Sequence, residues 1–206
     1  MFISGADEAG RGPVIGPLVI CLATIDVAQE KELVELGVDD SKKLSPSTRK
    51  ELFPKIEKLC EYQLRVLSAS ELNERMAKES LNEIEARAIG ELASSVSGRI
   101  YVDLPEKYPN GFLRKAGLLG RDVIAEHKAD SKYPIVGAAS ILAKVTRDRI
   151  VAELAAEVGE IGSGYPADER TINALRDPKM RKKLKGHIRE KWSTLERVLQ
   201  PKLTDF

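Results

Sequence analysis

The sequence predicts an α/β domain, in which helices pack against a central sheet. Short apolar segments rich in β-branched residues alternate, in mixed order, with longer segments of helical periodicity, and this alternation is typical of layered α/β folds. The length of 206 residues suits one compact domain with an appendage, or two very small domains. With 42% hydrophobic and 32% charged residues, the composition indicates a soluble globular chain rather than a disordered one.

The first elements are expected to be strands. Residues 2–6 are a short apolar run that ends at Asp7. Residues 14–25 are continuously apolar and rich in β-branched side chains, so we expect a buried strand there. A short helix over residues 29–36 follows, and Gly37 closes it.

The next elements carry clear start signals. The pair Ser45–Pro46 supplies an N-cap and a proline at the first helical position, which predicts a helix over residues 46–61. Residues 62–67 alternate like a strand. The segment Ser80–Glu83 has the form of a capping box and predicts a helix over residues 80–95.

The second half of the chain repeats the alternation. Residues 99–103 form an expected strand that ends in an acid, and residues 121–126 form another. Residues 134–158 carry apolar positions at helical spacing and are rich in alanine, so we expect one long helix. Two further helices are expected over residues 168–176 and 178–198.

The sequence also indicates a compartment. No apolar run approaches the ~20 residues that a membrane span requires, and the N-terminus lacks the basic region of a signal peptide. Cys21 and Cys60 lie far apart and outside any Cys-x-x-Cys pair. This usage argues for a reducing compartment, and we expect a cytoplasmic protein without a disulfide scaffold or zinc ribbon.

Acidic residues stand at the ends of three expected strands. They are Asp7, Glu8, Asp103 and Asp130. Taken singly, each could be an ordinary solvated or helix-capping residue. Gathered at the carboxyl edge of an open sheet, where ligands bind, they would repel one another unless cations intervened. Oxygen ligands without histidine or cysteine suit Mg²⁺ or Mn²⁺, and two such ions about 3.5–4 Å apart can activate water at a phosphodiester.

A glycine-rich segment follows the first two acids. The segment 10–16 reads Gly-Arg-Gly-Pro-Val-Ile-Gly and loosely resembles a dinucleotide-binding loop. That motif needs a helix directly after it, whereas Pro17 and the following apolar run indicate a strand. A simple tight turn and a loop that approaches a sugar-phosphate backbone both remain open.

Six sequence blocks share the order and spacing of one known family. They are Asp7–Val19, Asp40–Ser45, Tyr101–Asp103, His127–Pro134, Ala138–Lys144 and Gly162–Tyr165. Together they resemble the motif series of type 2 ribonuclease H (ribonuclease HII) in its archaeal form. The resemblance implies a ribonuclease H-like fold, with a mixed central sheet flanked by helices and a helical C-terminal extension. It divides the chain into a catalytic domain over residues 1–167, a helical substrate-binding extension over 168–199 and a tail over 200–206.

The resemblance also implies an activity. The expected enzyme is an endonuclease that hydrolyses the RNA strand of RNA–DNA hybrids and cuts 5′ to single ribonucleotides in duplex DNA. Such an enzyme uses Mg²⁺ or Mn²⁺, leaves 3′-OH and 5′-phosphate ends, and serves ribonucleotide and RNA primer removal. We expect a monomer. The alternative is a hybrid-binding module that has lost catalysis, although all four acids are present.

Family roles transfer to individual residues. The metal-binding and catalytic acids fall on Asp7, Glu8, Asp103 and Asp130. The residues expected to contact the ribose 2′-OH and adjacent phosphates are Gly10, Arg11 and Gly12. Tyr165 would stack at the RNA–DNA junction, where a packed core aromatic is the alternative. The residues that the family's Asp-Ser-Lys-Lys block places near the nucleic-acid backbone are Ser41, Lys42 and Lys43. Lys144 follows Ser140 by four residues on an alanine-rich helix, and this spacing favours a lysine that points at a phosphate over a Ser–Lys nucleophile pair. A closely fitted site that forms hydrogen bonds with the ribose 2′-OH would reject DNA. Deoxyribose lacks this hydroxyl, so the buried polar groups of the site would be left without partners.

The near-neutral charge hides a segregation. The chain carries 33 basic and 32 acidic residues, a formal charge of +1, which alone would argue against a nucleic-acid partner. The segment 179–191, however, carries seven basic residues against Glu190 alone. They are Lys179, Arg181, Lys182, Lys183, Lys185, Arg189 and Lys191. Such a run is usually a solvated face, but beside a nuclease core it predicts a phosphate-binding surface. We expect Arg181, Lys182 and Lys183 to contact the phosphates of the substrate.

The last seven residues carry a second interaction motif. Gln200 is followed three residues later by Leu203, and Phe206 ends the chain. This spacing resembles a truncated binding motif for the sliding clamp PCNA, in which a short turn presents the two apolar side chains as a plug. A frayed terminus is the alternative.

Overall fold

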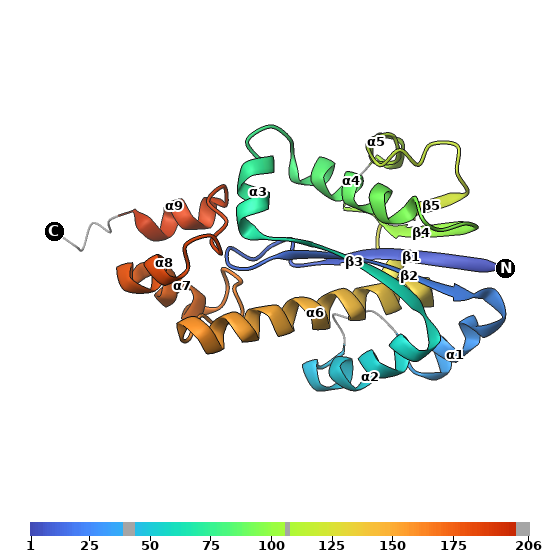
Figure 1. Ribbon diagram of the computed structural model, residues 1–206, viewed down its shortest axis with the longest axis horizontal. Coiled ribbons are helices and arrows are strands. Elements are labelled where there is room, and N and C mark those ends of the chain that lie inside the picture. Colours follow the sequence, from blue (N-terminus) through green and yellow to red (C-terminus); the bar gives the residue numbers. More distant parts are fainter. Residues whose placement is uncertain (39–43, 106–107, 201–206) are drawn as a thin grey trace. The chain divides into compact units, whose positions relative to one another are not determined.

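The computed structural model describes residues 1–38, 44–105 and 108–200 (Figure 1). A five-stranded sheet has the order β3-β2-β1-β4-β5. Strand β1 pairs antiparallel with β2 and parallel with β4, which is parallel to β5. The strands are β1 (Phe2–Ala9), β2 (Leu18–Asp26), β3 (Glu61–Leu67), β4 (Arg99–Asp103) and β5 (Val123–Glu126). The predicted mixed sheet with flanking helices is therefore confirmed.

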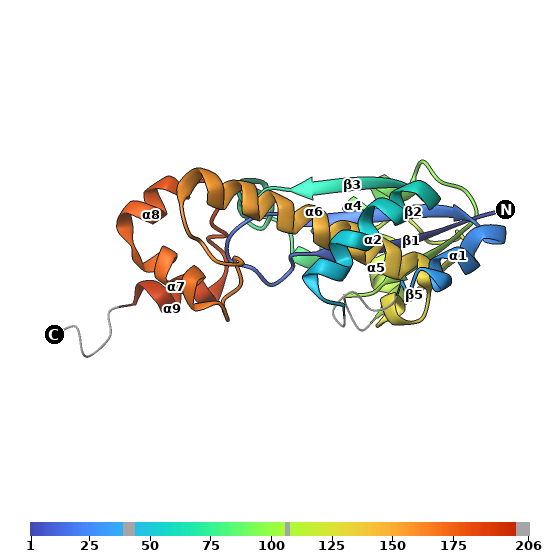
Figure 2. The same ribbon diagram turned by 90° about the horizontal axis from the view of Figure 1, so that it is seen from below.

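The described residues form nine α-helices and two short 3₁₀ turns. The helices are α1 (Glu30–Glu35), α2 (Pro46–Leu59), α3 (Ala69–Arg75), α4 (Leu81–Ala93), α5 (Pro109–Lys115), α6 (Pro134–Val158), α7 (Glu169–Arg176), α8 (Pro178–Lys183) and α9 (Ser193–Leu199). The 3₁₀ turns are Val27–Gln29 and Ala129–Ser131. In Figure 1, α4 and α5 lie on one side of the sheet, and Figure 2 shows α2 and α6 crossing the other side.

The chain divides into two compact units. The sheet unit contains Met1–Ala9, Val19–Val66 and Glu79–Thr146, and the C-terminal unit contains Gly10–Leu18, Leu67–Lys78 and Arg147–Phe206. Helix α6 contributes its first half to the sheet unit and its second half to the C-terminal unit. The glycine-rich segment and α3 belong to the C-terminal unit together with the C-terminal helices, and the division into functional domains over residues 1–167, 168–199 and 200–206 stays a prediction.

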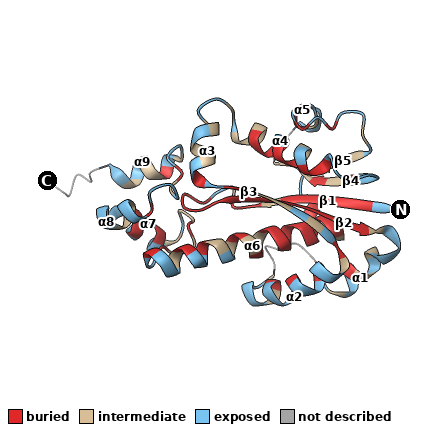
Figure 3. Cartoon of the chain, in the orientation of Figure 1, coloured by how far each residue is buried: buried red, intermediate tan, exposed pale blue. Residues whose placement is uncertain are grey.

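The sheet unit is built on a fully buried pair of strands. Strands β1 and β2 are buried along most of their length (Figure 3). Gly5 in β1 faces the start of α6, and a Cβ atom there would lie 2.6 Å from the backbone carbonyl carbon of Ile135. Only glycine therefore allows α6 to lie this close to the sheet. The predicted capping box at the start of α4 is confirmed, because Ser80 and Glu83 each accept from the other's backbone N–H.

The C-terminal unit has its own apolar core. Its buried members are Val14, Ile15, Val151, Leu154, Val158, Ile161, Ala174, Leu175 and Leu184. Trp192 and Leu195 pack against them. Asp168 caps α7 by accepting from the backbone N–H of Arg170, and Asp177 caps α8 in the same way through Lys179. These caps define where each short helix begins.

Two predicted elements were wrong in extent. The strand expected over residues 14–25 begins only at Leu18, because the N–H groups of Val14 and Ile15 donate to the Gly164 carbonyl instead of to a strand. The helix expected over 178–198 is broken. Gly186 has φ +85°, which a helix cannot continue, and the segment after it pairs with the segment 14–16.

Helices α3 and α5 were not predicted. Helix α3 has a conventional start, since Ser68 accepts from the backbone N–H of Glu71, and Pro109 occupies the first turn of α5. Each spans only seven residues, too short for hydrophobic periodicity to reveal it.

Candidate active site

The three parallel strands bring acids together at one edge of the sheet. Asp7 lies near the end of β1, Asp103 is the last residue of β4, and Asp130 lies in the 3₁₀ turn after β5. One carboxylate oxygen from each of the three lies within 4.8 Å of the others. Because parallel strands end at the same edge of a sheet, the topology converts three distant positions in the sequence into one cluster.

Asp7 is the most strongly perturbed of these acids. Its side chain is only 4% exposed. Burial raises the pKa of Asp7 well above its usual value, and the charges of Glu8 and Asp103 raise it further. A hydrogen bond from the Ser140 hydroxyl on α6 acts in the opposite direction, because it favours the ionised carboxylate. The carboxylate is therefore held in a site where a bound cation would be the strongest stabilising charge.

Backbone geometry positions the other two acids. The backbone N–H of Ala129 donates to Oδ1 of Asp103 at 2.9 Å. This contact depends on Lys128, whose φ of 59° and ψ of 36° place it in the left-handed region. The turn that follows holds Asp130 at 3% exposure. Asp103 and Asp130 are thus connected through one short turn.

Glu8 contributes differently from the other three. Its backbone N–H donates to Oδ1 of Asp7 at 2.7 Å. Consecutive residues of a strand point to opposite faces, and among the described residues the metal-capable group consists of Asp7, Asp103 and Asp130 without Glu8. The structure therefore brings together three of the four predicted acids, and Glu8 acts on the cluster by raising the pKa of Asp7.

The donor set suits a hard divalent cation. All three groups are carboxylates, which are the ligands that Mg²⁺ and Mn²⁺ prefer. Asp7 and Asp130 are buried and Asp103 is half-buried, and acids this close repel one another in the absence of a positive charge. Ser140 supplies a supporting hydrogen bond from one turn of α6 before Lys144, which is partly exposed. The residues present thus fit a metal centre of the kind that the sequence predicts.

The glycine-rich segment, hereafter the glycine loop (residues 10–16), belongs to the C-terminal unit. Gly10 has φ +96°, and a Cβ atom there would lie 2.6 Å from the Pro17 carbonyl oxygen. Gly12 is exposed, and a Cβ atom there would lie 3.7 Å from Cε1 of Tyr165. The structure therefore brings the predicted loop residues and the predicted tyrosine side by side.

Tyr165 lies in a loop that is held from several directions. The Gly164 carbonyl accepts from the backbone N–H groups of Val14 and Ile15, at 2.8 and 3.2 Å. The Arg147 guanidinium lies 4.8 Å from the centre of the Tyr165 ring and donates to the Ser163 carbonyl at 2.7 Å. Tyr165 is neither fully buried nor fully exposed, so it is not simply a core aromatic.

The basic side chains of the segment 179–191 differ in their surroundings, since some bond to helix ends and others are exposed. Arg181 donates to the Leu175 and Arg176 carbonyls at the end of α7, and Lys183 donates to the Val158 carbonyl at the end of α6. These two predicted phosphate contacts therefore also cap helix ends. Lys182 is exposed, and with Arg181 and Lys185 it borders a hollow of about 360 Å³ whose apolar lining includes Leu195.

Sequence reasoning missed the roles of two arginines. Arg147 is 1% exposed and Arg189 is fully buried. Each lies among charged neighbours in the sequence, where an arginine is expected to face solvent. Only the tertiary fold distinguishes them from the exposed basic residues beside them.

Some predicted residues lie outside the described parts of the chain. They are Ser41, Lys42, Lys43, Leu203 and Phe206. Gln200 directly follows α9 and is exposed.

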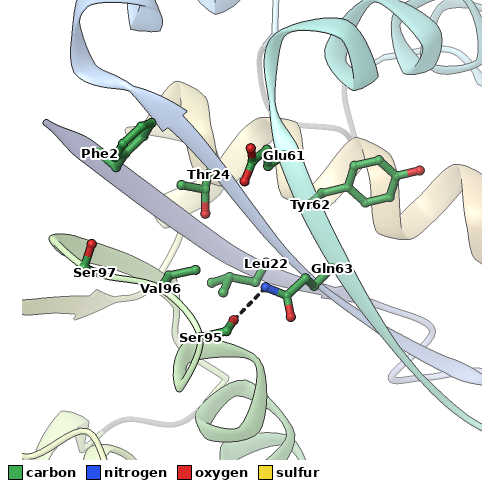
Figure 4. A pocket seen from close by; sticks show the side chains of 9 residues that line it. All are labelled: Phe2, Leu22, Thr24, Glu61, Tyr62, Gln63, Ser95, Val96 and Ser97. Atoms are coloured by element: carbon green, nitrogen blue, oxygen red, sulfur yellow. Dashed lines mark hydrogen bonds between the residues drawn. The ribbon is translucent and has the colours of Figure 1, made fainter.

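A separate hollow lies on the sheet unit, on the face that α4 covers (Figure 4). It measures about 260 Å³ and is lined by parts of β1, β2 and β3 and by the residues after α4. Gln63 donates to the Ser95 hydroxyl across it at 2.7 Å. No predicted site residue lines it.

Among the described residues, no helix is both long enough and apolar enough to cross a membrane.

Known proteins are similar to this chain in sequence and fold over nearly its whole length. A curated ribonuclease HII from Thermoplasma volcanium is 46% identical over 198 residues, covering 94% of this chain and 91% of that protein. The crystal structure of ribonuclease H2 from Pyrococcus horikoshii OT3 has a TM-score of 0.85 at 42% identity, covering 96% and 97% of the two chains. The structure of the PCNA:RNase HII complex from Archaeoglobus fulgidus has a TM-score of 0.88 at 40% identity, covering 99% of this chain and 100% of that chain.

The family itself is matched directly. The family model described as Ribonuclease HII covers residues 4–195. This range includes the four predicted acids, the glycine loop and Tyr165, and it ends before Gln200. The resemblance found in the sequence motifs is thereby confirmed. The chain belongs to the ribonuclease HII family and is accordingly a hydrolase, an endonuclease of the ribonuclease H type.

Proposed function

We propose that this protein cleaves the RNA strand of RNA–DNA hybrids and incises duplex DNA 5′ to single embedded ribonucleotides. The cluster of Asp7, Asp103 and Asp130 is the observation that carries this proposal, because three carboxylates within 4.8 Å form a ligand set for divalent cations. Bound there, Mg²⁺ or Mn²⁺ would lower the pKa of a water molecule and stabilise the departing 3′-oxygen, leaving 3′-OH and 5′-phosphate ends.

The chain's own residues would perform the remaining tasks. The three acids hold the cation and define its position relative to the strand ends. Gly10, Arg11 and Gly12 present backbone groups and one cation to the sugar-phosphate backbone, and Tyr165 offers a ring beside Gly12 for stacking. The exposed lysines of the basic segment, Lys182 among them, supply sequence-independent attraction for the duplex.

The decisive experiment is a cleavage assay with Mg²⁺ and a labelled DNA duplex that contains one ribonucleotide. We expect a single cut 5′ to the ribonucleotide, no cut in the matched all-DNA duplex, and no activity after chelation of the metal. Asp7→Asn keeps the shape of the side chain but removes the charge that binds the cation, so cleavage should fall below detection while duplex binding persists. The same result is expected for Asp103→Asn.

The control is Glu35→Gln, which makes the same charge-removing change at an exposed position of α1. Full activity in Asp7→Asn would refute the metal assignment. Binding of the hybrid without cleavage by the wild-type protein would instead identify a hybrid-binding module, and cleavage of the all-DNA duplex would indicate a different nuclease.

We further infer that the tail docks on a sliding clamp of the PCNA type. The spacing of Gln200, Leu203 and Phe206 supports this inference. The structure of the PCNA:RNase HII complex from Archaeoglobus fulgidus, whose ribonuclease chain is 40% identical to this one, supports it independently.

A further inference from the structure

Arg189 does not behave like the basic residues around it. Its side chain is completely buried, although Lys185, Glu190 and Lys191 are exposed. Burying a guanidinium is costly unless its donors find acceptors. Its position therefore needs an explanation other than attraction for phosphate.

The acceptors of Arg189 belong to the glycine loop. Its Nε donates to the Gly16 carbonyl at 2.9 Å, and its Nη1 donates to the Arg11 carbonyl at 3.4 Å. The guanidinium carbon lies 4.9 Å from the centre of the Trp192 ring, which covers the charge with an aromatic face. One side chain thus reaches both ends of the loop.

The backbone around Arg189 reinforces this contact. The backbone N–H of Arg189 donates to the Val14 carbonyl at 2.8 Å, and that of Gly16 donates to the His187 carbonyl at 2.9 Å. Ile15 and Ile188 form an antiparallel bridge. These bonds hold residues 14–16, and the guanidinium extends the contact to the Arg11 carbonyl.

The segment that carries Arg189 is itself anchored from its other side. Asn73 on α3 donates to the Ile188 carbonyl at 2.9 Å and accepts from the backbone N–H of Glu190 at 2.8 Å. The Ser70 hydroxyl donates to the Gly186 carbonyl at 3.1 Å. The segment is therefore hydrogen-bonded on both sides, to α3 and to the glycine loop.

We propose that Arg189 is a positioning residue for ribonucleotide recognition. By holding the Arg11 carbonyl, it sets the orientation of the peptide between Arg11 and Gly12, and so the direction of the backbone groups that would meet the ribose. The C-terminal extension is then part of the recognition site and not only a surface for the duplex. This inference rests on the proposed function.

The chemistry of arginine is specific here. A planar guanidinium donates in two directions at once and stacks on an aromatic ring. A lysine can keep the charge but cannot span the two carbonyls and cover Trp192. Arg189→Lys should therefore fold and yet lose the donor to the Arg11 carbonyl, whereas Arg189→Met removes every polar contact of the side chain.

The experiment measures kcat and KM for a duplex with one ribonucleotide, in wild type, Arg189→Lys and Arg189→Met. We expect kcat to fall about tenfold or more in Arg189→Met, since small misplacements of a binding group are costly, and to take an intermediate value in Arg189→Lys. Mn²⁺ affinity, measured by calorimetry, should be unchanged, because the acid cluster belongs to the sheet unit. The control Arg176→Met, at an exposed position of α7, should match wild type.

A double-mutant cycle with Gly12→Ala separates positioning from a purely structural role. If Arg189 acts through the loop, its substitution should change kcat less than about twofold once Gly12→Ala has disturbed that loop. Independent, multiplying effects would overturn the inference, as would wild-type kcat in both Arg189 variants. Should Arg189→Met not fold, Arg189→Lys alone decides by the same cycle. Failure of the wild-type protein to cut any ribonucleotide-containing duplex would instead refute the proposed function.

Discussion

At the scale of single residues, the acid cluster depends on one hydroxyl from α6. Asp7 is buried, and burial raises its pKa. The Ser140 hydroxyl offsets part of this effect, because a donated hydrogen bond stabilises the ionised carboxylate more than the neutral acid. Ser140 is itself 4% exposed, so water cannot easily replace it. It therefore favours the charged form of Asp7, which the proposed metal ligand requires.

Ser140→Ala tests this role. Loss of the hydrogen bond should make ionisation of Asp7 harder and weaken Mn²⁺ binding by about 10–100-fold, the usual effect of removing a partner of a metal ligand. Isothermal titration calorimetry at fixed pH measures the change. Ser97→Ala, at an exposed position outside the cluster, should bind Mn²⁺ like wild type. Equal affinities in all three proteins would show that the hydroxyl only fills space.

At the scale of elements, the start of α7 is connected to the loop that carries Tyr165. Asp168 caps the helix and also accepts from the backbone N–H of Ser163 at 2.7 Å. The Arg170 guanidinium beside it, together with these backbone donors, holds the pKa of Asp168 well below its usual value. One carboxylate therefore stabilises both the helix end and the loop.

The pH dependence of Asp168→Ala follows from that lowered pKa. At pH 7 the substitution should reduce the free energy of unfolding by about 1–2 kcal/mol, the range for loss of an N-cap. A carboxyl whose folded pKa is lowered contributes its full stabilisation above its unfolded pKa, near 3.8, and this contribution is lost progressively as pH falls from that value towards the lowered folded pKa. The difference between the two proteins should therefore narrow below about pH 4.

Denaturant unfolding across pH 2.5–7 measures this difference. Asp168→Asn is the matched control, since an amide oxygen keeps the N-cap acceptor but loses the charge that Arg170 pairs with. It should be more stable than Asp168→Ala at pH 7. A gap between wild type and Asp168→Ala that is constant with pH would contradict the ionic contribution.

At the scale of the whole molecule, the acid cluster and the residues proposed to recognise the ribonucleotide lie in different units. The sheet unit holds the three acids, and the C-terminal unit holds the glycine loop, Tyr165 and the basic segment. The chain passes from Asp7 and Glu8 directly into the glycine loop. The near-neutral total charge combines an acidic metal-capable cluster with a basic helical surface, and so says little about the partner.

Removal of residues 200–206 tests the tail at this scale. The truncated protein should lose affinity for the PCNA of Archaeoglobus fulgidus and cleave a short duplex at the wild-type rate. Phe206→Ala alone should weaken clamp binding roughly 30-fold or more, as expected for a buried aromatic anchor. Lys202→Ala, which changes a residue outside the motif, should bind like wild type. Surface plasmon resonance measures the affinities, and unchanged binding by the truncated chain would dismiss the motif.

Several features were readable from local sequence because their causes are local. Helix α6 occupies the predicted range 134–158, and the capping box before α4 forms as expected. Hydrophobic periodicity and capping side chains act over a few residues. The broken helix after Lys183 shows the opposite case, because there the pairing with residues 14–16 prevails over helical propensity.

The sequence by itself determined the fold class, the family and the acids that belong to its motifs. Only the tertiary structure decided that Asp7, Asp103 and Asp130 meet while Glu8 acts from beside them, because strand order and the alternation of side chains set that geometry. It also decided that Arg147 and Arg189 are buried supports rather than surface charges. The reason is physical: a guanidinium looks the same in sequence wherever it lies, and its role depends on which carbonyls and rings the fold brings within reach.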